Sequence, residues 1–206
     1  MEWLIGAGII MIPLLICSVL SLAVIIERAI NLRRSNILKP EIIQTIEAIR
    51  CLDDIPIAIS KCEVIPGPFS NLLKRILVNP HLTREEKLFE VQAAGRQEMK
   101  ALEKRLWILE VVYAVAPLLG LLGTVLGLEN IFGVISELGL GHAKAFSGGL
   151  AVAIRNTAVG LFIAIPCLVA FTYFDKKVDS LVLEMEEYSL HLLNVLYPVN
   201  DYDRNT

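Results

Sequence analysis

The stretch GGLAVAIRNTAVGLFIAIPCLVAF, residues 148–171, is apolar along most of its length and decides the fold class. About twenty consecutive apolar residues span a hydrocarbon core about 30 Å thick when they are helical. Two further stretches meet this requirement, and the composition, 55% hydrophobic, is too apolar for an ordinary soluble domain. The sequence therefore predicts an all-α membrane protein with three transmembrane helices.

Basic residues indicate how the predicted helices are oriented. They gather after the first and third spans, whereas the turn between the second and third spans holds only Lys144 and His142. Cytoplasmic loops carry an excess of Lys and Arg, so we expect the N-terminus outside and the C-terminus in the cytoplasm. Glu27 is interpreted as the partner of Arg28 in a solvated ion pair at the headgroup level, with a specific docking contact as the alternative. The gathered residues are Arg28, Arg33, Arg34, Lys39, Lys176 and Lys177.

The region between the first two spans is interpreted as a series of helices. Pro40 has the position of a helix start, and Thr83 with Glu86 has the form of a capping box. No helix breaker follows Arg84 before Pro117, so we expect one helix to continue into the second span. Such a helix would have about 52 residues and a length of about 78 Å.

The C-terminal segment repeats the helical pattern until Pro198 and is predicted to extend the third span. These signals divide the chain into consecutive segments. They are a first transmembrane helix (1–30), a cytoplasmic helical region continuing into the second span (31–106), the second transmembrane helix (107–136), a short periplasmic turn (137–145), the third transmembrane helix (146–174) and a cytoplasmic C-terminal helix and tail (175–206).

Small residues and prolines mark the second and third spans. In lipid, small residues let helix backbones approach closely, and packing drives helix association. We therefore assign the glycines to helix packing, and we expect the two prolines to mark bends that free backbone carbonyls. The residues are Gly120, Gly123, Gly127, Gly149, Gly160, Pro117 and Pro166.

Two threonines, Thr124 and Thr157, are the candidate pathway residues. A lone membrane threonine most often bonds a carbonyl of its own helix. The short turn between the second and third spans makes these helices antiparallel, however, and both threonines then fall at a similar depth. The spacing therefore keeps two roles open, a bond within the helix and the lining of an ion pathway.

The motifs APLLGLLGTVLGLENIF, residues 116–132, and GLAVAIRNTAVGLFIAIP, residues 149–166, resemble the paired signature of the MotA/TolQ/ExbB family, most closely its TolQ/ExbB branch. The first span with VIIERAINLRRS, residues 24–35, agrees more loosely. The resemblance implies a pentameric ring in the bacterial inner membrane, around a single-span partner like ExbD or TolR. It also implies that Thr124 and Thr157 face the central pore.

In this family the ring and its partner form a motor driven by the proton motive force. The motor powers outer-membrane transport or envelope maintenance, through proteins such as TonB or TolA. The resemblance thus implies that the chain is a ring subunit that translocates protons, with sodium as the open alternative. Flagellar-type stators of the family usually have a fourth membrane helix, whereas three are predicted here.

The chain departs from the family pattern at three positions of its spans. Val152 stands where the family motif has a glutamate, and Glu129 and Arg155 stand where it has apolar residues. Charges inside a bilayer are costly and usually face protein and pair, so we expect an ion pair between Glu129 and Arg155, within one subunit or between two. The alternative is that each charge bonds other polar groups independently.

The sequence lacks the residue patterns of enzymes, metal sites and nucleic-acid-binding proteins. No set of nucleophile, base and orienting group is visible, no phosphate-binding glycine loop occurs outside the spans, and the histidines lack metal-ligand spacing. The mixed charge outside the spans does not suggest nucleic acid. We therefore expect neither an enzyme, a cofactor nor a metal site. A non-conducting membrane scaffold or signalling subunit of the same fold remains the alternative, motivated by Val152.

Overall fold

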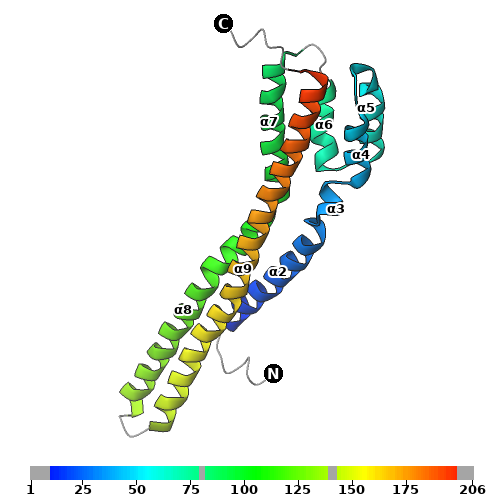
Figure 1. Ribbon diagram of the computed structural model, residues 1–206. Coiled ribbons are helices and arrows are strands. Elements are labelled where there is room, and N and C mark those ends of the chain that lie inside the picture. Colours follow the sequence, from blue (N-terminus) through cyan, green and yellow to red (C-terminus); the bar gives the residue numbers. More distant parts are fainter. Residues whose placement is uncertain (1–9, 79–81, 139–142, 199–206) are drawn as a thin grey trace. The chain divides into compact units, whose positions relative to one another are not determined.

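The computed structural model describes residues 10–78, 82–138 and 143–198 of the chain, and the regular structure of these residues is helical (Figure 1). This confirms the predicted all-α class. The elements in chain order are α2 (Met11–Asn31), α3 (Arg34–Ile37), α4 (Pro40–Ala48), the short 3₁₀ helix η1 (Leu52–Asp54), α5 (Ile55–Val64), α6 (Pro68–Val78), α7 (Arg84–Glu103), α8 (Leu106–Leu138) and α9 (Ala143–Leu196).

Three of these helices are long and apolar enough to cross a membrane, as predicted. The apolar candidates are Met11–Asn31, Leu106–Gly133 and Ser147–Leu196. The expected beginning of the first span before residue 10 lies outside the described residues, and so does the middle of the expected turn at 137–145.

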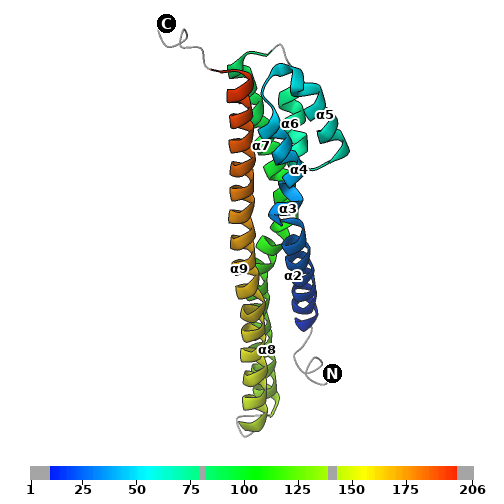
Figure 2. The same ribbon diagram turned by 45° about the vertical axis from the view of Figure 1, so that its right-hand side comes forward.

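The chain folds into two compact units. The first unit is made of Met1–Arg28 and Arg105–Phe174. In it α8 and α9 run side by side and antiparallel, and α2 joins them (Figures 1 and 2). Their shared core is a cluster of buried side chains from all three helices: Leu14, Val112, Ala116, Ala164 and Cys167.

The second unit consists of Ala29–Lys104 and Asp175–Thr206. Its buried side chains come mainly from α6, α7 and α9, and the rings of Phe69 on α6 and Tyr188 on α9 lie 5.9 Å apart. Lys87 on α7 is only 1% exposed, and its ammonium group donates to the carbonyl of Ile76 at 2.8 Å. Burial lowers the pKa of Lys87. The buried cation therefore fastens α7 to the end of α6.

Local signals fix several helix ends as predicted. The Thr83 hydroxyl accepts from the backbone N–H of Glu86, and the Glu86 carboxylate accepts from the N–H of Thr83, which confirms the capping box. Pro40 opens α4. The third span and the C-terminal segment form one helix of 54 residues, which ends at Leu196 before Pro198.

The prediction of one helix from Arg84 through the second span is wrong. The chain breaks between α7 and α8, where Arg105 has a φ of 80°. A side-chain-bearing residue in this left-handed region cannot continue a right-handed helix. The Arg105 guanidinium bonds the carboxylate of Glu27 on α2 at 2.7 Å, so a tertiary contact accompanies the break.

Candidate functional site

The hydroxyls of Thr124 on α8 and Thr157 on α9 are hydrogen-bonded to each other. Backbone carbonyls surround the pair. The Thr157 oxygen lies 3.2 Å from the carbonyl of Gly120, and the Thr124 oxygen lies 3.2 Å from the same carbonyl and 3.1 Å from that of Ala153. The two threonines, expected at a similar depth on antiparallel helices, are thus in direct contact, while their role in an ion pathway stays a prediction.

Glycines allow the two helices to come this close. A Cβ atom on Gly160 would lie 2.5 Å from the carbonyl oxygen of Ala116, and one on Gly120 would lie 2.9 Å from the carbonyl oxygen of Asn156. A Cβ on Gly127 would lie 3.0 Å from that of Ala153. The structure thus places these glycines at the contact between α8 and α9, where a side chain would force the backbones apart.

The same contact continues toward the connection between the two helices. A Cβ on Gly149 would lie 2.5 Å from the side chain of Ile131, and one on Gly123 would lie 2.8 Å from the Cβ of Asn156. The prolines lie inside the helices, Pro117 in α8 and Pro166 in α9. The seven residues assigned to packing therefore all belong to this helix pair.

Asn156 is a member of the contact that the sequence did not single out as a site residue. Its side chain is only 3% exposed, and its Oδ1 atom has no hydrogen-bond partner among the described residues. The missing side chain of Gly123 leaves the space that the Asn156 amide fills. An amide directly before Thr157 was visible in the sequence, but its burial follows from Gly123 on the other helix.

The candidate ion-pair residues differ in their exposure. Glu129 is exposed on α8 of the single chain, and Arg155 is half-buried on α9. Val152 is also half-buried. The pairing of Glu129 with Arg155 stays a prediction, in particular as a bond between neighbouring copies, because the Glu129 side chain is accessible to another chain.

A second polar cluster lies where α2 ends. The Glu27 carboxylate lies 2.7 Å from Arg105 and 3.6 Å from Arg28. Arg28 is only 6% exposed, so the interpretation of Glu27 and Arg28 as a solvated pair is wrong for the arginine. No local signal pointed to Arg105, because the residues around it contain neither glycine nor proline.

The chemistry available at the threonine pair is that of neutral hydroxyls. Each hydroxyl carries one proton to donate and two lone pairs to accept. One proton links the two oxygens, and the other can reach a carbonyl of Gly120 or Ala153. Among the described residues no group of three or more His, Cys, Asp or Glu side chains could hold a metal ion.

Known proteins are similar to this chain in sequence. The sequence profile of the MotA/TolQ/ExbB proton channel family matches residues 66–187. The biopolymer transport protein ExbB of Aquifex aeolicus is 42% identical over 87 residues, which are 42% of this chain and 59% of the relative. The Tol-Pal system protein TolQ of Pseudomonas aeruginosa is 32% identical over 114 residues, 55% of this chain and 49% of the relative. An ExbB-like protein of Synechocystis is 30% identical over 180 residues, 82% of this chain and 81% of the relative.

Fold and site together define an all-helical membrane protein whose last two candidate spans pack through glycines around a hydroxyl pair. The chain belongs to the MotA/TolQ/ExbB proton channel family, and its relatives are of the ExbB and TolQ type. It spans 59%, 55% and 38% of the length of the ExbB proteins of Aquifex aeolicus, Helicobacter pylori and Xanthomonas campestris. The matched part is therefore about half of these relatives.

Proposed function

We propose that this chain is a ring-forming subunit of an ion-driven motor in the bacterial inner membrane. Five copies surround a single-span partner of the ExbD or TolR type, with the N-terminus periplasmic and the C-terminus cytoplasmic. The motor uses the proton motive force for outer-membrane transport or envelope maintenance, through a protein of the TonB or TolA type. On this proposal the chain is not an enzyme and holds no cofactor.

The contact between Thr124 and Thr157 is the observation that carries the proposal. It lies between two candidate spans and offers hydroxyls that both donate and accept, without the cost of another buried charge. The names of the relatives, biopolymer transport and Tol-Pal system, support a role in transport or envelope maintenance.

In the proposed mechanism the hydroxyl pair is the seat for an ionisable carboxyl group of the partner. A threonine hydroxyl donates to the carboxylate form and accepts from the protonated form. Protonation removes the charge and weakens the bond, so the partner helix can move to the seat of the next copy. Ion flow then becomes rotation or tilting of the partner relative to the ring.

Ion uptake into vesicles tests the proposal. Vesicles contain the purified chain with or without its co-purifying single-span partner, and proton and sodium uptake are measured for the unmodified chain and for Thr157→Ala. Thr172→Ala is the matched control, because the Thr172 hydroxyl donates to the carbonyl of Leu168 on its own helix, 2.9 Å away. We expect partner-dependent uptake that Thr157→Ala abolishes and Thr172→Ala leaves unchanged.

A non-conducting scaffold or signalling subunit is the second candidate. It is favoured by Val152, which replaces the membrane carboxylate that the family motif has at this position. The two functions differ in the vesicle assay, because a scaffold shows no uptake of either ion even when the complex with the partner is intact by mass.

A further inference from the structure

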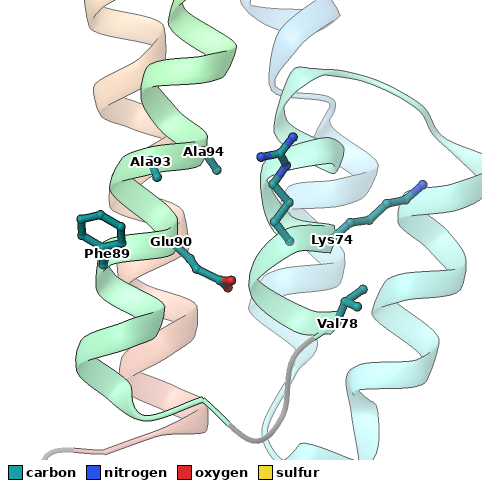
Figure 3. A pocket seen from close by; sticks show the side chains of 7 residues that line it. Lys74, Val78, Phe89, Glu90, Ala93 and Ala94 are labelled. Carbon is teal, nitrogen blue, oxygen red and sulfur yellow. The ribbon is translucent and has the colours of Figure 1, made fainter.

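The second unit exposes large apolar side chains in a groove between α6 and α7. The cavity has a volume of about 470 Å³, and Val78 and Phe89 in its lining are 56% and 73% exposed. Figure 3 shows α6 with Lys74 and Val78 on one side of the groove, and α7 with Phe89, Glu90, Ala93 and Ala94 on the other. Exposed apolar side chains gathered in one patch outside the candidate spans are typical of a surface that another chain covers.

The charge around this α6–α7 groove is positive on balance. Lys74 and Arg75 line it from α6, and Glu90 lines it from α7. These two cations and one carboxylate leave one net positive charge, and both cations lie on the α6 side of the groove. A partner with an apolar ridge and acidic flanks therefore fits this groove.

Such a ridge runs along the exposed side of α9 in the same unit. Asp179, Leu183, Glu187 and Leu190 recur at helical spacing, and we name these residues the α9 stripe. Leu183 and Leu190 are 65% and 40% exposed. With Lys176, one turn before Asp179, the stripe carries one cation and two carboxylates, which leaves one net negative charge.

Contacts inside the unit show which residues of α7 and α9 lie level with each other along the helix axes, and so give the relative heights of the groove and the stripe. A Cβ on Gly95 of α7 would meet the Glu186 carboxylate of α9 at 2.5 Å, and Arg84 donates to the Asn194 side chain at 2.5 Å. The two helices are antiparallel, so Phe89, about midway between the α7 positions, lies level with about residue 190 of α9. By the same interpolation Ala93 lies level with about residue 187.

We propose that the α9 stripe of one copy docks into the α6–α7 groove of the next copy, head to tail around a ring. This inference rests on the proposed function, because it needs a ring whose axis runs along these helices. Rotation about that axis preserves height, so Leu190 meets Phe89 and Glu187 meets the basic side of the groove at Arg75. A contact between two different surfaces of one chain gives a ring when its rotation closes, and a helix ridge in an apolar groove is a common recognition mode.

Disulfide crosslinking in membranes of the producing cells, with the full chain and its partner present, tests the contact. The background is Cys17→Ser combined with Cys51→Ser, because Cys51 is exposed and Cys17 is half-buried, whereas Cys62 and Cys167 are buried. We expect Phe89→Cys combined with Leu190→Cys to give a ladder of oligomers under oxidation. Each single variant gives no ladder, and a mixture of the two single variants gives dimers only, since each bond needs one residue from each surface.

Two controls test the register and the charge. Phe89→Cys combined with Leu183→Cys, which moves the thiol two turns along α9, should give little crosslinking. Glu187→Arg should lower the yield of the Phe89–Leu190 pair by up to about fivefold, the effect of an exposed ion pair, and Arg75→Glu should restore it. Glu63→Arg on α5, which is also exposed, should leave the yield unchanged.

The outcomes separate this inference from the proposed function. A ring that is intact by native mass but gives no ladder with the Phe89–Leu190 pair overturns the docking contact alone. Dimers formed by Phe89→Cys or Leu190→Cys singly overturn it too, because they require a symmetric contact. A solubilised complex that contains only one copy of the chain overturns the ring itself.

Discussion

The guanidinium of Arg105 lies 2.7 Å from the carboxylate of Glu27, and the backbone of Arg105 has a φ of 80°. The pair joins the end of α2 to the beginning of α8. The first compact unit ends at Arg28 and begins again at Arg105. Glu27 and Arg105 therefore lie at two of the points where the chain crosses between the units. Positive φ is costly for a residue other than glycine, and the ion pair offsets part of that cost.

The variants Arg105→Gly and Arg105→Ala should therefore differ in their stability. Arg105→Gly loses the ion pair but adopts the positive φ without strain, whereas Arg105→Ala loses the pair and keeps the strain. We expect the glycine variant to be more stable than the alanine variant by about 1 kcal/mol. Thermal unfolding of the two variants in the same detergent measures this difference.

Glu27→Gln supplies the control for the ion pair. It should cost at most about 1 kcal/mol through the bond to Arg105, whose side chain is half exposed, and less in Arg105→Ala, where the contact of Glu27 with Arg28 remains. An alanine variant as stable as the glycine variant would show that the break between α7 and α8 carries no backbone strain.

The glycines of the α8–α9 contact should differ in their tolerance of a methyl group. Gly160→Ala places a Cβ 2.5 Å from the Ala116 carbonyl oxygen and 3.1 Å from the Gly120 Cα, and these backbone atoms cannot move without separating the helices. We expect a loss of about 1–3 kcal/mol in thermal unfolding. Gly149→Ala should cost less, because the Ile131 side chain that it meets can rotate.

Gly148→Ala is the matched control for Gly160→Ala. A Cβ at this position has no described heavy atom within 4 Å, so the change adds helix propensity without a clash. Its unfolding temperature should equal or exceed that of the unmodified chain. Equal losses for Gly160→Ala and Gly148→Ala would contradict the close approach of the two helices.

Local patterns were enough to predict much of the fold. Apolar length gave the three candidate spans, and Thr83, Pro40 and Pro198 gave helix ends, because each acts through its own neighbourhood. The break at Arg105 could not be predicted in this way. It occurs in a stretch with no helix breaker, and its ion-pair partner Glu27 belongs to another helix.

The candidate site was predictable in its members but not in its contacts. Antiparallel spans placed Thr124 and Thr157 at equal depth, but depth alone does not bring two oxygens together. Their bond requires the close approach at Gly120 and Gly160, which depends on how the helices rotate about their axes. For the same reason the burial of Asn156 against Gly123 was not visible in the sequence.

Glu98 and Glu86 should give opposite effects of pH on stability. Burial raises the pKa of Glu98 above its ordinary 4.5, so the folded state holds this proton more tightly than the unfolded state. This contribution to stability is full below pH 4.5 and is lost as the pH rises through the raised pKa. Glu98→Gln should therefore stabilise the chain at neutral pH and have little effect below pH 4.5.

Glu86, in the capping box of α7, should show the opposite dependence of stability on pH. The backbone N–H of Thr83 and its hydroxyl donate to the Glu86 carboxylate, at 2.8 and 2.9 Å, and lower the pKa of Glu86. Its contribution is present above pH 4.5 and is lost as the pH falls through the lowered pKa. Glu86→Gln should thus destabilise the chain at neutral pH. Unfolding temperatures of both variants between pH 3 and pH 8, about the range that carboxyl groups govern, check the two signs. Shifts of the same sign would refute this assignment.

The exposed Glu129 and the half-buried Arg155 should depend on each other in the assembled ring. A charge in a bilayer is costly, so Glu129→Gln and Arg155→Met should each weaken assembly by removing one charge of the expected pair. Their combination should restore part of the loss, because both charges are then absent. Native mass measurements of the detergent-solubilised complex give the fraction of assembled rings for the four chains of this cycle. Losses that simply add would show that each charge bonds other groups, and restored assembly would support the pair, within one subunit or between two.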